Sequence, residues 1–131
     1  MPESAFETSL SSLVLRTTKV DACLEFYRRL GLSFVEEKHG KGPVHYSSSS
    51  NGVLIEIYPE PQKDVTERAA EASIRLGFTV EALAATLESL ETIGARVLRQ
   101  PALTRWGRVA VALDPDGREV EINEPLKIET A

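Results

Sequence analysis

The chain has 131 residues, a hydrophobic content of 42% and a formal net charge of −5. This length suits one compact domain, residues 1–131, that can bury a core without a disulfide or a structural metal. The acidic balance argues against a nucleic-acid partner, and no apolar run is long enough to cross a membrane, so we expect a cytoplasmic protein.

The first half of the chain is predicted to form a strand, a helix and three more strands. After the strand SLVLRT (12–17), apolar residues follow at the spacing of one helical face and the pattern stops at a glycine, Gly31. These apolar residues are Val20, Leu24, Tyr27 and Leu30. Further strands are expected at 33–38, 44–50 and 51–58.

The second half repeats this pattern at a shift of 63 to 65 residues. A strand at 73–80 precedes a second amphipathic segment, and strands are expected at 96–100, 105–113 and 116–123. The predicted fold is therefore α+β, with two βαβββ modules. We place module one at 10–59 and module two at 72–125, joined by a polar, proline-containing linker at 60–71.

Each module ends in a strand with one glutamate four residues after a glycine. These are Glu56 after Gly52 and Glu121 after Gly117. Strand alternation places the neighbours Ile55, Ile57, Val120 and Ile122 on the buried, helix-facing side. Both glutamates are then expected on the opposite face.

Strand register adds further candidates to that face. If Leu113 pairs with Arg118, then Glu121 lies opposite Ala110, and the same offset places His45 opposite Glu56. A two-residue Asn-Gly hairpin would instead pair Glu56 with Ser47, which keeps His45 on the same face. His45 is then either a hydrogen-bonded wall residue or a functional one.

Trp106 and Arg108 have the same strand parity as Ala110 and are therefore also expected to face inward. Trp106 either packs the strand end or provides an aromatic platform for a planar ligand. Arg108 either binds an anionic ligand or neutralises a glutamate.

The segments FYRRLGL (26–32) and WGRVAVALDPDGREVEI (106–122), on this repeated plan, resemble the glyoxalase/bleomycin resistance protein/dioxygenase superfamily, also called vicinal oxygen chelate proteins. The resemblance covers Ser12 to Pro125. It implies modules that curve into a mixed sheet around a cavity, commonly completed as a homodimer. The family contains enzymes and drug-sequestering proteins, so the fold does not specify one activity.

The resemblance also implies four metal-ligand positions: a His in the first strand and a Glu in the last strand of each module. Here Glu56 and Glu121 match, but the His positions carry Ser12 and Arg75. Arginine has no lone pair to donate and would repel a cation, so we expect it to pair with Glu56 or Glu121. We therefore expect no metal or other cofactor there.

The expected function is binding of a small organic molecule in the cavity between modules, without metal. The candidate ligand-binding residues are Ser12, His45, Glu56, Arg75, Trp106, Arg108 and Glu121. The alternative is a metal-dependent lyase or dioxygenase that uses Glu56, Glu121 and His45. The missing histidines favour the first function over an enzyme.

Overall fold

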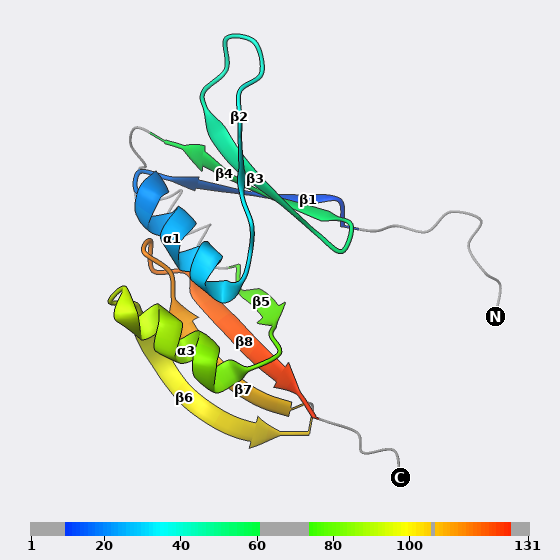
Figure 1. Ribbon diagram of the computed structural model, residues 1–131, viewed down its shortest axis with the longest axis vertical. Coiled ribbons are helices and arrows are strands. Elements are labelled where there is room, and N and C mark those ends of the chain that lie inside the picture. The colour runs from blue at the N-terminus through cyan, green and yellow to red at the C-terminus, as the bar shows by residue number, and fades with distance from the viewer. Residues whose placement is uncertain (1–9, 61–73, 106, 127–131) are drawn as a thin grey trace, which may run out of the picture.

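The computed structural model describes residues 10–60, 74–105 and 107–126. Within these ranges, a strand, a helix and three strands occur in that order and then repeat once (Figure 1). The predicted α+β fold of two βαβββ modules is therefore confirmed. The expected linker at 60–71 lies almost entirely outside the described residues.

The first module is a mixed sheet in the order β1-β4-β3-β2, with β1 parallel to β4 and the other neighbours antiparallel. Its elements are β1 (Ser12–Thr17), α1 (Val20–Leu30), β2 (Val35–Glu37), β3 (His45–Ser50) and β4 (Val53–Pro59). Asn51 and Gly52 join β3 to β4 with φ angles of 47° and 86°. Two positive φ angles are typical of a two-residue hairpin, and Ser47 accordingly lies opposite Glu56.

The second module has the same plan in the order β5-β8-β7-β6, with β5 parallel to β8. Its elements are β5 (Leu76–Thr79), α3 (Leu83–Thr92), β6 (Arg96–Thr104), β7 (Gly107–Leu113) and β8 (Glu119–Pro125). No helix in the described part of the chain is long and apolar enough to cross a lipid bilayer.

Both helices bury the face that the apolar spacing predicted. Five residues of α1 are buried: Cys23, Leu24, Phe26, Tyr27 and Leu30. Gly31 then adopts a φ of 117°, and its N–H donates to the carbonyl of Arg28. This left-handed residue ends α1 because glycine adopts that conformation without steric cost.

The two modules share one hydrophobic core around the helices. In Figure 1, α1 lies between the two sheets and next to α3, and the Tyr27 and Phe78 rings are 6.0 Å apart. The sheets turn Ile55, Ile57, Val120 and Ile122 toward this core, and each is at most 5% exposed. As predicted, Glu56 and Glu121 therefore lie on the faces turned away from the core, which we call the outer faces.

The predicted register between β7 and β8 is wrong by one residue. Leu113 pairs with Glu119, so Glu121 lies opposite Val111 instead of Ala110. The turn is one residue longer than predicted. The Asp114 N–H donates a hydrogen bond to the Arg118 carbonyl at 3.0 Å, and Gly117 adopts a positive φ of 87° within this longer turn.

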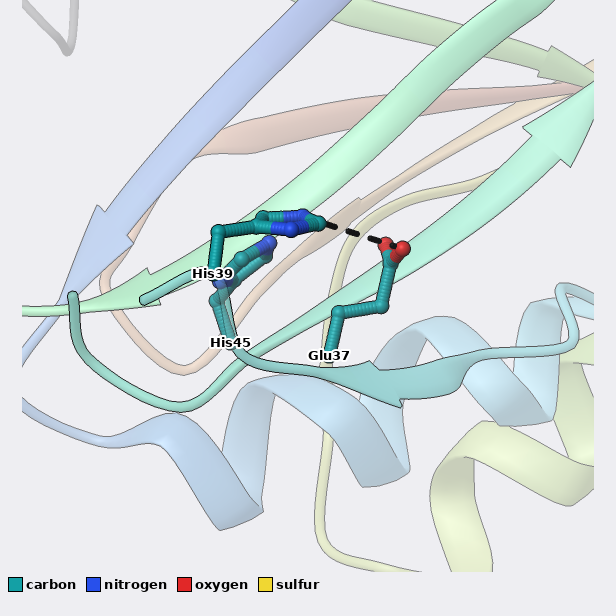
Figure 2. Close-up of side chains that lie close together, drawn as sticks. All are labelled: Glu37, His39 and His45. Atoms are coloured by element: carbon teal, nitrogen blue, oxygen red, sulfur yellow. Dashed lines mark ion pairs between the residues drawn. The ribbon is translucent and has the colours of Figure 1, made fainter. Parts of the chain in front are cut away.

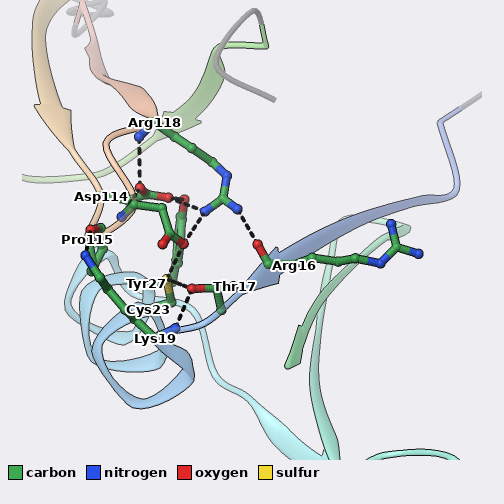
Figure 3. Close-up of polar contacts among 9 residues, drawn as sticks. Arg16, Thr17, Lys19, Cys23, Tyr27, Asp114, Pro115 and Arg118 are labelled. Atoms are coloured by element: carbon green, nitrogen blue, oxygen red, sulfur yellow. Dashed lines mark hydrogen bonds and ion pairs between the residues drawn. The ribbon is translucent and has the colours of Figure 1, made fainter. Parts of the chain in front are cut away.

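A buried polar cluster joins this hairpin to the first module (Figure 3). The Arg118 guanidinium donates to Asp114 at 2.9 Å, to Asp116 at 3.0 Å and to the main-chain carbonyl of Arg16 in β1 at 2.7 Å. From α1, the Tyr27 hydroxyl donates to Asp114 at 2.7 Å. We call Arg118, Asp114, Asp116 and Tyr27 the Arg118 clamp.

Burial changes the acid–base properties of the groups at the clamp. Burial, followed by the negative charge of Asp114, raises the pKa of Tyr27 well above its ordinary value. Burial also raises the pKa of the neighbouring Cys23 thiol to about 12, so the thiol stays protonated. Burial alone would raise the pKa of Asp116, but hydrogen bonds with Thr17 and Cys23 and the charge of Arg118 lower it overall.

Replacing Arg118 with Ala should strongly destabilise the protein. Asp114 and Asp116 would lose their cation, and breaking a buried ion pair in this way costs about 3–5 kcal/mol. Arg108→Ala is the matched control because Arg108 is exposed, and it should change the free energy of unfolding by less than about 0.5 kcal/mol. Urea unfolding of both variants measures the difference, and equal losses would contradict the role of the clamp.

Asp116 should make stability depend on pH in the acid range. Its pKa in the folded protein lies below the ordinary value of 3.8, so its contribution is complete above that value and is lost as pH falls through the folded pKa. The free energy of unfolding should therefore drop below about pH 4. Asp116→Asn should flatten the drop, and identical pH curves for parent and variant would exclude this contribution.

Candidate functional site

The outer face of the first sheet carries three residues that the sequence predicted together. Register places Ser12 and Val14 of β1 and Glu56 of β4 on the same side as His45 and Ser47 of β3. Ser12 is exposed, Glu56 is partly buried and His45 is only 2% exposed. The Nε2 atom of His45 lies 3.6 Å from Oε2 of Glu56.

The His45 ring is held on two sides. It stacks on Tyr58 with ring centroids 4.2 Å apart and planes 7° apart. Its Nδ1 lies 3.2 Å from the carbonyl oxygen of Pro43, and this oxygen can only accept, so Nδ1 carries the proton. Nε2 has no hydrogen-bond partner among the described residues.

Two more groups on this face escaped the sequence analysis. Glu37 of β2 lies opposite His45 and accepts a hydrogen bond from the Ser47 hydroxyl. Partial burial and then the negative charges of Glu56 and Glu37 raise the pKa of Tyr58, which places all three side chains in one electrostatic environment. Parity with Glu56 would have found Tyr58, but Glu37 required the pairing of β2 with β3.

The outer face of the second sheet carries Arg75 and Glu121, but they do not form the expected ion pair. Gly77 of β5 lies opposite Glu121. Arg75, two residues before Gly77 in the chain, forms an ion pair with Glu119 at 2.6 Å. The hydrogen bond to Glu119, followed by its charge, raises the pKa of Arg75, and Glu121 contributes a smaller electrostatic effect. The prediction that Arg75 pairs directly with Glu56 or Glu121 is therefore wrong.

The prediction that Arg108 faces inward with Glu121 is also wrong. With Leu113 paired to Glu119, the β7 residues on the face of Glu121 are Val109 and Val111, whereas Arg108 has the parity of the fully buried Ala110. Arg108 is exposed at the strand end, on the helix side. Trp106 lies outside the described residues.

One groove of about 420 Å³ lies at the junction of the modules. Leu13 and Ile55 line it from the first sheet, and Arg75, Leu76 and Phe78 line it from the second module. Among the predicted ligand-binding residues, only Arg75 contributes to this lining. Glu56 and Glu121 lie on the outer faces of different sheets, and neither lines this groove. A ligand site that uses both glutamates would therefore need a second surface to enclose it.

The side chains at the family's metal-ligand positions do not fit a divalent ion. Arg75 is held by Glu119 and offers no lone pair, and Ser12 offers a neutral hydroxyl. A catalytic transition-metal site normally has three protein ligands, typically including imidazole. Glu56 and Glu121 alone do not supply that set.

Comparison with known proteins identifies the family of the chain. A model of the glyoxalase/bleomycin resistance protein/dioxygenase superfamily matches residues 9–122. None of the curated proteins matches the chain in sequence.

Several solved structures are similar in fold. An antibiotic binding protein from Streptomyces sp. CB03234 has a TM-score of 0.69 at 19% identity, with 95% of this chain and 100% of that chain covered. A bleomycin resistance determinant encoded on the transposon Tn5 has a TM-score of 0.62 at 21% identity, with 92% and 100% covered. A glyoxalase/bleomycin resistance protein/dioxygenase family enzyme from Burkholderia phytofirmans PsJN has a TM-score of 0.66 at 21% identity, with 91% and 100% covered.

Arg75→Ala should have only a small effect on stability. The Arg75–Glu119 pair is exposed on both sides, at 46% and 43%, and water screens such pairs. Its melting temperature should therefore stay close to that of the parent, far above that of Arg118→Ala. A loss comparable to that of Arg118→Ala would show that Arg75 has a buried partner.

Proposed function

This chain belongs to the glyoxalase/bleomycin resistance protein/dioxygenase superfamily, and on that premise we propose that it binds a small organic molecule against the outer faces of its sheets, without metal at the family's ligand positions. The observation that carries the proposal is the outer face of the first sheet. It combines the stacked His45–Tyr58 pair with Glu56 and with Val14 and Val35, which are 40% and 65% exposed. Apolar and aromatic area with a few polar groups is typical of ligand sites.

The charges on this face indicate the chemistry of the ligand. Glu56 is a hydrogen-bond acceptor and attracts a positive group, while Tyr58 offers a stacking surface. We therefore propose a planar or aromatic molecule that carries a cationic or hydrogen-bond-donating group. The similarity in fold to an antibiotic binding protein and to a bleomycin resistance determinant supports an antibiotic as the first ligand to test.

A second copy of the chain is the proposed closure of the site. In one chain the outer faces belong to separate sheets, and β1 and β5 are edge strands of those sheets. Edge strands are commonly covered by pairing, and two-fold dimers are the commonest solution. We propose a homodimer in which the outer face of one module lies over that of the partner's other module.

Ligand binding should depend on the outer face of the first sheet. Isothermal titration with bleomycin and with a panel of cationic aromatic antibiotics should identify a binder, and Tyr58→Ala and Glu56→Gln should each weaken it by about tenfold or more. Arg108→Ala, on the opposite side of its sheet, should bind like the parent. Equal affinity in all four proteins would contradict the proposed site.

The dimer is tested separately by light scattering at micromolar concentration, where twice the chain mass of 14.4 kDa is expected. A monomer that still binds ligand would refute the proposed closure but keep the outer-face site.

The competing function is catalysis, and the His45–Glu56 contact of 3.6 Å is the observation in its favour. An imidazole beside a carboxylate is suited to proton transfer. Glu121 lies on the other sheet, so an enzyme that uses Glu56, Glu121 and His45 would require the dimer. Mass spectrometry of the bound ligand after incubation distinguishes the two functions, since a binding protein returns it unchanged.

A further inference from the structure

His45 is a buried imidazole whose second nitrogen, Nε2, has no hydrogen-bond partner within residues 10–60, 74–105 and 107–126. The residue is 2% exposed, and its Nδ1–H donates to the Pro43 carbonyl. With that proton on Nδ1, Nε2 is the ring nitrogen that can offer a lone pair. Glu56 is the nearest carboxylate at 3.6 Å, beyond the usual range of an N–H···O hydrogen bond. Buried polar atoms are rarely left unpaired, and an unpaired lone pair on a fixed imidazole is what a metal ion requires.

Two other potential metal ligands lie close to His45, one on β2 and one in the loop that follows it. One ligand atom each from Glu37, His39 and His45 lies within 4.8 Å of the others (Figure 2). Oε2 of Glu37 lies 3.9 Å from Nε2 of His39, and the two imidazole centroids are 5.1 Å apart. From these contacts we infer that Glu37, His39 and His45 form a binding site for a divalent transition metal, with Zn²⁺ as the preferred ion.

The geometry needs only a modest adjustment to hold the ion. Ligand atoms about 2.0–2.1 Å from a tetrahedral zinc lie roughly 3.3 Å from one another. The ligand atoms must therefore move closer together by up to about 1.5 Å, and His39 can supply this movement because its side chain is 72% exposed. His45 and Glu37 are already oriented, by Pro43 and by the Ser47 hydroxyl, as second-shell partners orient metal ligands.

The ligand types select the metal. Two imidazoles and one carboxylate suit zinc and its neighbours, whereas Mg²⁺ and Ca²⁺ prefer oxygen ligands. Three protein ligands leave a fourth position for water, and Glu56 lies beside His45 to accept a hydrogen bond from it. All three ligands come from residues 37–45 of the first module, so the site needs neither Ser12 nor Arg75 and does not depend on the proposed function.

The test is zinc binding by untagged protein that has first been dialysed against a chelator and then freed of it. Competition with a chromophoric chelator should show one Zn²⁺ per chain, and Co²⁺ should give the intense visible absorption of a tetrahedral site. His39→Ala and Glu37→Gln should each weaken zinc binding by at least about tenfold. His39 carries the main test because it is exposed and its loss leaves the core intact; circular dichroism checks the fold of each variant.

Two controls separate this site from others. Glu36→Gln changes the residue before Glu37 in β2. The Glu36 side chain lies on the opposite face of the sheet, where it accepts a hydrogen bond from the Tyr46 hydroxyl. Glu121→Gln removes a carboxylate at the family's metal-ligand position. Both should bind zinc like the parent.

The inference is overturned if the parent does not bind zinc at micromolar concentration, if His39→Ala binds like the parent, or if Glu121→Gln is the variant that loses the metal. None of these measurements uses an organic ligand, so failure of the proposed function leaves them unaffected.

Discussion

The arrangement of the two modules depends on the Arg118 clamp. One buried guanidinium satisfies Asp114 and Asp116 of its own hairpin and also donates to the Arg16 carbonyl in β1, while Tyr27 of α1 donates to the same Asp114. Burying charges such as those of Arg118 and Asp114, at 4% and 0% exposed, is costly unless they are paired and hydrogen-bonded. The clamp therefore constrains the position of β1 and α1 relative to the second sheet, and the apolar core fills the space between them.

The location of the candidate sites follows from this arrangement. Both sheets turn their apolar faces toward α1 and α3. Because side chains alternate along a strand, their polar residues lie on the outer faces, away from the shared core. The first outer face is chemically richer, since it gathers Glu37, His45, Glu56 and Tyr58. The second has Glu121 beside the exposed Arg75–Glu119 pair. The two modules thus share a fold but differ in what their outer faces can bind.

The sequence predicted most of the fold because the fold depends on periodic signals. Apolar spacing located both helices, and alternation correctly assigned Ile57 and Ile122 to the core. The β7–β8 register was missed because Gly117 and the Asp114–Arg118 bonds lengthen the turn by one residue. In the site, His45 and Glu56 were found by parity, whereas Glu37 and His39 depend on strand pairing and loop geometry that periodicity does not encode.

The turns that precede β4 and β8 differ in what they contribute to the rest of the chain. The Asn51-Gly52 turn of the first module is a minimal connector, whereas the corresponding turn of the second module contains Asp114, Asp116 and Arg118. If the halves descend from one duplicated ancestor, a tandem of two first modules would lack the clamp altogether. The charged side chains of the clamp all lie in the second module, so the two halves of the chain are not interchangeable.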